Sequence, residues 1–248
     1  MIIDAHTHLG YDYVFETKFE LEDLVSNMEK NNVDACILQP GTCLDIGKIV
    51  QQHDAIAKLS RETPSKIYGM ANPNPHLPTK DYRDEIERCV NELGFVGVKL
   101  HPFAHAVNPN GNDAKKVYIS ALEHGISVMV HTGAGVPWAL PSLLIPVARE
   151  FPDVKIILAH CGSAIYSDEA ALAAGLCQNI YLETSWLPGY TIQSYCENFG
   201  ADRVMLGSDH GGNMEAELSK YRSLNLSKEE LEWCLGNTAA KVFKISPR

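Results

Sequence analysis

Short apolar runs recur along the chain, and each is followed by a longer stretch with apolar residues at helical spacing. The short runs are bounded by turn residues and predict buried strands. We expect strands near Met1–His8, Asp34–Gln39, Ile67–Asn72, Val96–His101, Ser127–His131, Lys155–His160, Ile180–Thr184 and Arg203–Ser208. We expect helices over Glu20–Asn31, Ile46–Arg61, Lys80–Leu93, Asp113–His124, Pro141–Glu150, Asp168–Leu176, Gln193–Asn198 and Ser227–Phe243.

This alternation of eight strands with helices predicts an α/β protein, specifically a (β/α)8 TIM barrel. The strands are continuous apolar runs, which is typical of parallel strands covered by helices. The length of 248 residues suits such a barrel, and no linker interrupts it, so we expect a single domain over residues 1–248. A doubly wound sheet is the alternative, but no G-x-G-x-x-G fingerprint follows an early strand. Ser227 and Glu230 form a capping-box pattern at the start of the last helix.

The amino-acid composition limits the classes of molecule that the protein is expected to bind. The formal net charge is −10 without a basic stripe, so an acidic surface disfavours nucleic acid and membrane surfaces. No apolar run is long enough to cross a bilayer, and a strand at the N-terminus leaves no signal peptide. Seven scattered cysteines without a C-x-x-C pair indicate reduced, mostly buried thiols, and we expect Cys161 to point away from the barrel interior. We therefore expect a cytoplasmic protein with a small-molecule substrate, and leave a homodimer open.

The candidate chemistry lies at the ends of the predicted strands. His6 and His8 are two positions apart on the first strand, so both imidazoles project from one face. Three further strand-like runs end in His131, His160 and Asp209. Because barrel enzymes build their sites at the carboxyl ends of the strands, these side chains are expected to converge. Imidazoles with a carboxylate suit Zn²⁺ best, with Mn²⁺ or Fe²⁺ as alternatives.

The remaining histidines divide by position. His101, with Lys99, ends the fourth strand and is a candidate for metal or substrate binding. His105 and His210 lie in loops at the same rim, where substrate contact is open for His210 and disfavoured for His105. Three histidines lie away from strand ends and are expected to be solvated: His53, His76 and His124.

Several motifs together resemble the amidohydrolase superfamily, in particular its branch of aminocarboxymuconate-semialdehyde decarboxylase-like enzymes. The motifs are Asp4-x-His6-x-His8, Gly97-Val98-Lys99-Leu100-His101-Pro102, His131-Thr132-Gly133, Ala159-His160-Cys161-Gly162, Gly207-Ser208-Asp209 and Gly236-Asn237-Thr238-Ala239-Ala240. The resemblance implies four metal ligands, His6, His8, His131 and Asp209. It implies that His160 is a catalytic residue near the metal, or a ligand of a second metal.

In binuclear relatives a lysine on the fourth strand is carboxylated and bridges two metals. Here His101 takes the terminal position on the same face, so we expect Lys99 to be an unmodified lysine. It would lie one layer deeper, where a charge is costly unless paired. Asp4, two positions before His6, is one candidate partner for its ammonium.

The expected activity is hydrolysis of a small amide, lactone or ester by a metal-activated water. Asp209 would take the proton from that water, and His160 would hydrogen-bond the developing oxyanion. The alternative is a metal-dependent, non-oxidative decarboxylase of a small carboxylic acid, in which His160 and Asp209 manage proton transfer. A non-catalytic binding protein is disfavoured because every ligand type is present.

The sequence leaves the substrate open. Trp138, Trp186 and Tyr190 lie in rim loops, where they either wall a substrate pocket or anchor the loops. No arginine is placed at the rim as a carboxylate clamp, since Arg149 and Arg203 fall on a helix and at a strand start. This favours a neutral substrate over a dicarboxylate.

Overall fold

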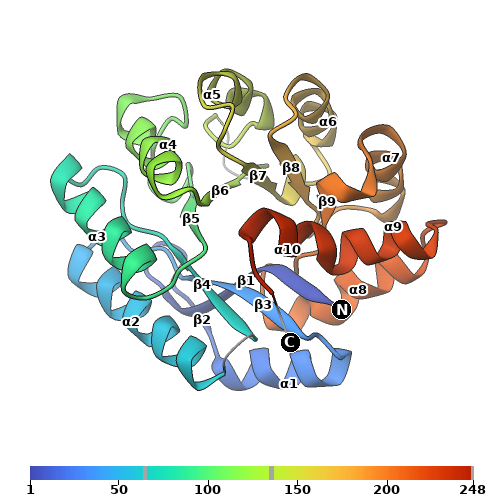
Figure 1. Ribbon diagram of the computed structural model, residues 1–248, viewed down its shortest axis with the longest axis horizontal. Coiled ribbons are helices and arrows are strands. Elements are labelled where there is room, and N and C mark those ends of the chain that lie inside the picture. Colours follow the sequence, from blue (N-terminus) through green and yellow to red (C-terminus); the bar gives the residue numbers. More distant parts are fainter. Residues whose placement is uncertain (64–65, 134–136, 247–248) are drawn as a thin grey trace.

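The computed structural model describes residues 1–63, 66–133 and 137–246. At its centre is a curled sheet with the strand order β2-β1-β3-β4-β5-β6-β7-β8-β9 (Figure 1). The strands are β1 Ile3–Asp12, β2 Thr17–Phe19, β3 Ala35–Pro40, β4 Ile67–Ala71, β5 Gly97–Leu100, β6 Ser127–His131, β7 Ile156–Ala159, β8 Ile180–Glu183 and β9 Val204–Met205. β2 pairs antiparallel with β1, whereas β1 and β3 to β9 pair in parallel.

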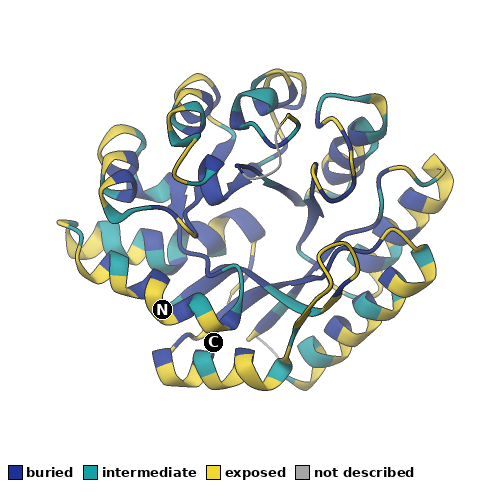
Figure 2. Ribbon diagram, turned by 180° about the vertical axis from the view of Figure 1, so that it is seen from behind, coloured by how far each residue is buried: buried dark blue, intermediate teal, exposed yellow. Residues whose placement is uncertain are grey.

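Helices surround the sheet, with exposed outer faces and buried faces toward the strands (Figure 2). They are α1 Leu21–Asn31, α2 Ile46–Glu62, α3 Thr79–Asn91, α4 Asn112–His124, α5 Leu144–Glu150, α6 Ser167–Leu176, α7 Gly189–Phe199, α8 Met214–Arg222, α9 Lys228–Glu232 and α10 Thr238–Phe243. Since each crossover between parallel strands carries a helix on the outside, the carboxyl ends of the strands all meet at one rim.

Two apolar clusters fill the molecule, one on each face of the sheet. Alternate strand residues such as Ile37, Met129 and Ile157 pack inside the curl, together with Val242 and Phe243 of α10. Figure 1 accordingly shows α10 lying across the middle of the ring of helices. The intervening residues pack outward against the helices, and Cys161 belongs to this outer cluster, as predicted. All seven cysteines are described, all are buried, and none of them forms a disulfide.

Backbone hydrogen bonds join the first parallel strand to the segment that follows the last. The Ala5 amide donates to the Leu206 carbonyl at 3.0 Å, and the Ser208 amide donates to the His6 carbonyl at 3.0 Å. Thr7 and Asp209 form a parallel bridge. These contacts place Asp209, which follows β9, directly beside the histidines of β1.

Two elements differ from the prediction. The hairpin of β1 and β2 was not predicted, because its turn has no Gly-rich signal and its apolar residues are exposed. Helix α8 was also missed, although Met214, Leu218 and Tyr221 are buried at helical spacing.

The last predicted helix is interrupted. Its capping box at Ser227 and Glu230 is confirmed, but a π-helical segment, Trp233–Asn237, separates α9 from α10. Gly236 lies in this segment, where an added Cβ would come within 2.7 Å of the Met1 carbonyl oxygen. The close approach of the chain start thus requires glycine at this position. Among the described residues, no helix combines the length and apolarity needed to cross a membrane.

Candidate metal centre

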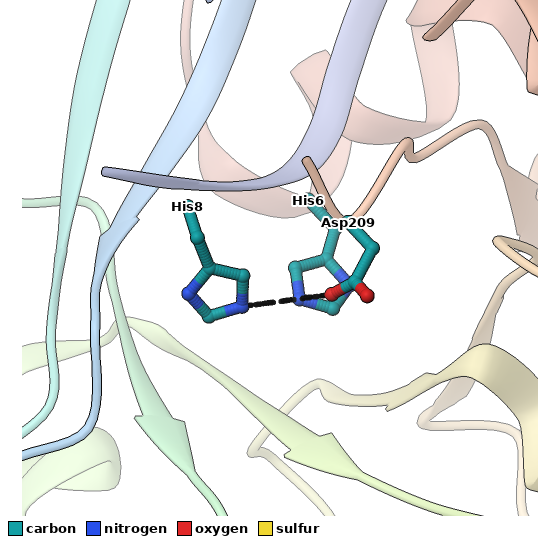
Figure 3. Close-up of side chains that lie close together, drawn as sticks. All are labelled: His6, His8 and Asp209. Carbon is teal, nitrogen blue, oxygen red and sulfur yellow. Dashed lines mark hydrogen bonds and ion pairs between the residues drawn. The ribbon is translucent and has the colours of Figure 1, made fainter. Parts of the chain in front are cut away.

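The structure brings His6 and His8 of β1 together with Asp209, and Figure 3 shows the three side chains pointing toward one another. The two Nε2 atoms are 3.1 Å apart, and Asp209 Oδ1 lies 3.5 Å from His6 Nε2 and 3.7 Å from His8 Nε2. The donor atoms all lie within 4.8 Å of one another. Two imidazoles and a carboxylate at this spacing are a donor set for a divalent transition metal.

The orientation of both imidazoles follows from their Nδ1 partners. His6 Nδ1 donates to Glu183 Oε2 at 2.7 Å, and His8 Nδ1 donates to the Pro40 carbonyl at 3.3 Å. With a proton on each Nδ1, each Nε2 presents a lone pair, and these lone pairs face each other. Burial lowers the pKa of His6 well below its usual value and that of His8 to about 4, so both remain neutral. Facing lone pairs are the arrangement that a bound cation satisfies, so the residues fit a metal.

Asp4 does not share the face of the two histidines, contrary to the expectation from alternation. The register of β1 against β3 shifts between Asp4 and Thr7, so an irregularity separates Asp4 from His6. Asp4 instead accepts hydrogen bonds from the His6 amide at 3.1 Å and from the Ser208 amide at 2.9 Å. Its carboxylate therefore supports the bulge and the segment after β9, rather than pairing with Lys99.

Lys99 lies at the cluster itself. Its Nζ is 2.9 Å from His6 Nε2 and donates into the lone pair that a metal would use. Burial lowers the pKa of Lys99 to about 8, which opposes a permanent charge beside a metal. The ammonium and a divalent cation thus compete for one lone pair.

Glu183, at the end of β8, is the main residue that sequence analysis missed. Its fully buried carboxylate accepts hydrogen bonds from His6 Nδ1, from the His160 amide at 3.1 Å and from the Ser185 hydroxyl at 3.0 Å. Burial raises its pKa, and these hydrogen bonds oppose the rise. The available signal was a carboxylate inside an otherwise apolar strand.

His160 is oriented through the same network. Its Nδ1 lies 2.7 Å from Ser185 Oγ, whose hydroxyl proton is directed to Glu183, so Nδ1 is the donor. The Nε2 lone pair then faces Asp209 Oδ1 at 3.8 Å. Burial lowers the pKa of His160 to about 4.

Asp209 is held in an uncommon conformation, with φ at +68°. Trp186 Nε1 donates to its Oδ2 at 2.9 Å, which leaves Oδ1 toward the histidines. Burial by itself would raise the pKa of Asp209, but nearby His160 and His6 lower it far below its usual value. Trp186, for which the sequence left substrate contact and loop anchoring as alternatives, thus orients a carboxylate of the site.

His101 and His131 stack on each other, with ring centroids 3.9 Å apart and planes 14° apart. The His131 ring also meets the His160 ring edge to face, with centroids 5.0 Å apart. Both stacked rings line the cavity described next, so His131 lies beside the cluster of His6, His8 and Asp209.

A cavity of about 220 Å³ opens beside these residues. Its polar wall contains His8, Lys99 and Asp209. Its apolar wall consists of three phenylalanines that sequence analysis did not single out: Phe15, Phe19 and Phe103. Phe15 and Phe103 stack with ring centroids 6.0 Å apart. The cavity therefore combines ionisable groups with aromatic faces, as small-molecule sites do.

Asp12 sets the turn that carries Phe15. Its Oδ1 accepts hydrogen bonds from the Val14 amide at 2.9 Å and the Phe15 amide at 2.8 Å. Its Oδ2 accepts one from the Thr42 amide at 2.7 Å. One buried carboxylate thereby ties the tip of the hairpin to the loop after β3.

Other predicted residues lie apart from this cavity. Trp138 is half-buried and Tyr190 is 78% exposed, and neither is among the described residues that line it. His210 lines a neighbouring cavity, and its ring centroid lies 5.8 Å from that of Trp186.

Two further histidines are buried, and for one of them, His53, the burial contradicts the prediction. His53 is fully buried rather than solvated, because its Nδ1 donates to Glu85 at 2.6 Å and its Nε2 accepts from the Asn72 amide at 3.0 Å. His105 is also buried, and burial lowers its pKa to about 4.

Comparisons with known proteins identify the family of the chain and proteins of similar fold. A family model described as amidohydrolase matches residues 3–245. The fold is similar to that of 5-carboxyvanillate decarboxylase from Sphingomonas paucimobilis, with a TM-score of 0.80, 16% identity and 99% of each chain covered. It is also similar to a manganese-bound dihydroxybenzoic acid decarboxylase from Polaromonas, with a TM-score of 0.80, 16% identity and coverage of 98% of this chain and 96% of that one. A 2,6-dihydroxybenzoate decarboxylase from Rhizobium has a TM-score of 0.75 and 16% identity over 98% of each chain.

Proposed function

The chain belongs to the amidohydrolase family, and from that premise we propose that it is a metal-dependent decarboxylase of a small aromatic carboxylic acid. The observation that carries the proposal is the cavity in which Lys99, His160 and Asp209 face a wall of phenylalanine rings. Similarity to decarboxylases of hydroxylated benzoic acids supports this activity over the hydrolysis expected from sequence.

We further propose that the curled sheet closes as a (β/α)8 barrel within a single domain. The backbone hydrogen bonds between β1 and residues 206–208, with the bridge between Thr7 and Asp209, support closure. A closed barrel gathers the strand ends into one rim, which is where this cavity lies.

His6, His8 and Asp209 would hold the divalent metal, with His131 as the fourth ligand. Manganese in similar structures makes Mn²⁺ a candidate beside Zn²⁺. When bound, such a metal polarises oxygen atoms of the substrate and stabilises negative charge that develops on them.

The chain's own residues would supply binding and proton transfer. The Lys99 ammonium, turned from His6 toward the cavity, would attract the substrate carboxylate. The phenylalanine rings would keep water away from the aromatic ring of the substrate. Decarboxylation leaves a carbon atom that needs a proton. His160 and Asp209, 3.8 Å apart, are the groups placed to hold and deliver it.

Hydrolysis remains a second candidate because of Asp209. Its carboxylate is ionised at neutral pH, as a general base must be, and its strongly lowered pKa makes it a weak base. The two reactions share their residues and differ in their products.

A panel of carboxyl-labelled hydroxybenzoates, together with aryl amides and lactones, separates the candidates. With metal-loaded protein we expect release of labelled CO₂ and no net acid from the amides or lactones. Acid release without CO₂ would replace the proposal with hydrolysis.

Elemental analysis should find about one divalent metal per chain. The double variant His6→Ala/His8→Ala should lose the metal and keep its circular dichroism, since rim residues serve function more than stability.

A further inference from the structure

A second cavity, of about 280 Å³, adjoins the one at the metal centre. It is lined by segments of β2, α1 and the loop after Asp209. The two cavities share His8 and Phe19. One imidazole and one phenyl ring thus stand between them.

We propose that Phe19 is a specificity-determining residue, whose ring separates the two cavities and thereby limits the length of the substrate. The inference rests on the proposed function only in taking the metal-side cavity as the place where substrate binds. His8 and Phe19 together form a partition between the two cavities. His8 belongs to the metal-binding set and is fixed by Pro40, so Phe19 is the residue of the partition that can change without loss of a metal ligand.

The position of Phe19 suits this role. It pairs with Gly10 at the end of β2, so its backbone is fixed by the hairpin. Its ring centroid lies 5.5 Å from that of His8 on one side and 6.4 Å from that of His210 on the other. The ring therefore touches the walls of both cavities, and its removal would join them.

The volumes of the two cavities determine how large a substrate fits with and without the Phe19 ring. About 220 Å³ is below the roughly 300–1,000 Å³ of sites for drug-sized ligands, so the metal-side cavity suits a single substituted ring. Joining the second cavity would more than double the space. Phe19 thus decides between a one-ring acid and a longer acid.

The second cavity also restricts the chemistry of the extension. Lys18 is neutralised by Glu20, with Nζ and Oε1 2.7 Å apart, and Asp23 adds a carboxylate that forms no ion pair with the described residues. An extension that ends in a second carboxylate would be repelled. The extension that fits is uncharged and polar, or cationic.

The test uses metal-loaded protein and a series of aryl hydroxamates, which chelate a metal whichever reaction the enzyme catalyses. The series runs from benzohydroxamate to para-substituted members with hydroxyalkyl or aminoalkyl chains of rising length. Binding is measured by calorimetry for wild type, Phe19→Ala and the milder Phe19→Leu. Phe15→Ala is the matched control, because Phe15 lines only the metal-side cavity.

A fourth variant refills the second cavity. An added Cβ at Gly212 would meet His210 atoms at 3.4 and 3.6 Å, which is ordinary contact, so Gly212→Leu starts without a clash at its Cβ. It is combined with Phe19→Ala. Thermal unfolding of each variant checks that the hairpin and the loop remain folded.

We expect Phe19→Ala to raise the affinity for long relative to short hydroxamates at least tenfold, and Phe19→Leu to do so less. Gly212→Leu should reverse the change, and Phe15→Ala should leave the length preference unchanged. An unchanged preference in Phe19→Ala, or an equal change in Phe15→Ala, would overturn the partition and leave the proposed function standing. If benzohydroxamate does not bind metal-loaded wild type, the proposed function and this inference both fail.

Discussion

Asp209 joins the two histidines of β1 to the tryptophan of the opposite loop. In Asp209→Asn the amide oxygen can still coordinate a metal, so we expect the fold and part of the metal affinity to remain. Turnover should fall by about 10²–10⁴-fold, because an amide neither accepts nor returns a proton at neutral pH. Steady-state rates and metal content of the purified variant check this.

Trp186→Phe is the control for the Asp209→Asn variant, because it changes how the carboxylate is held and leaves the carboxylate itself in place. It removes the Nε1 donor that holds Oδ2 and keeps an aromatic ring, so we expect a smaller loss of turnover than in Asp209→Asn. If Asp209→Asn turns over nearly as fast as wild type, Asp209 is a ligand only, and His160 carries the proton.

The hairpin of β1 and β2 is the element that completes the cavity. Asp12→Ala removes the acceptor of three backbone amides, those of Val14, Phe15 and Thr42. We expect a loss of about 1–3 kcal/mol in the free energy of unfolding and a rise in KM, because Phe15 loses its fixed position. Urea unfolding and steady-state kinetics measure the two effects.

Asp12→Asn should be milder, because its amide oxygen keeps the bonds to the turn and loses the one to Thr42. An Asp12→Ala variant with the KM of wild type would show that the hairpin does not shape the binding site.

For the whole molecule, buried histidines set the response to acid. Their folded pKa values lie below the usual 6.5, and for His8, His105 and His160 at about 4. Below pH 6.5 the unfolded chain therefore binds protons that the folded chain excludes, so stability rises with pH and falls on acidification toward pH 4. Carboxyl groups with raised pKa act in the opposite sense, because they bind protons in the folded state. They are fewer than the histidines with lowered pKa. The carboxyl groups are Asp4, Glu183 and Glu217, and the histidines are His6, His8, His53, His101, His105 and His160.

We expect the metal-free protein to lose more than about 1.4 kcal/mol of unfolding free energy per pH unit between pH 6 and 5, since net uptake exceeds one proton. Urea unfolding at pH 7, 6 and 5 measures the slope. Bound metal should raise the free energy of unfolding at each pH but leave this slope nearly unchanged, because its imidazole ligands are already unprotonated in the folded protein. Equal stability at pH 7 and 5 would contradict the neutral, buried state of these histidines.

His6 and His8 lie within β1, which continues beyond the predicted strand end to Asp12. The sequence by itself determined the alternation of strands and helices and the placement of His131, His160 and Asp209 at or after strand ends. Both follow from local rules, since apolar periodicity fixes each element and parallel strands share one rim. The family resemblance rests on motifs that include these residues, and a family model described as amidohydrolase matches residues 3–245.

Only the tertiary structure decided which partners meet. His6 and Glu183 are 177 positions apart, and no periodicity relates them. The bulge that turns Asp4 away from His6 arises from pairing with β3, and His53 is buried because α3 and the residue that follows β4 supply its partners. Phe15 and Phe19 lie outside every predicted element and become cavity walls only when the hairpin folds over the rim. Contacts between distant segments depend on how whole elements pack, and local sequence does not encode that packing residue by residue.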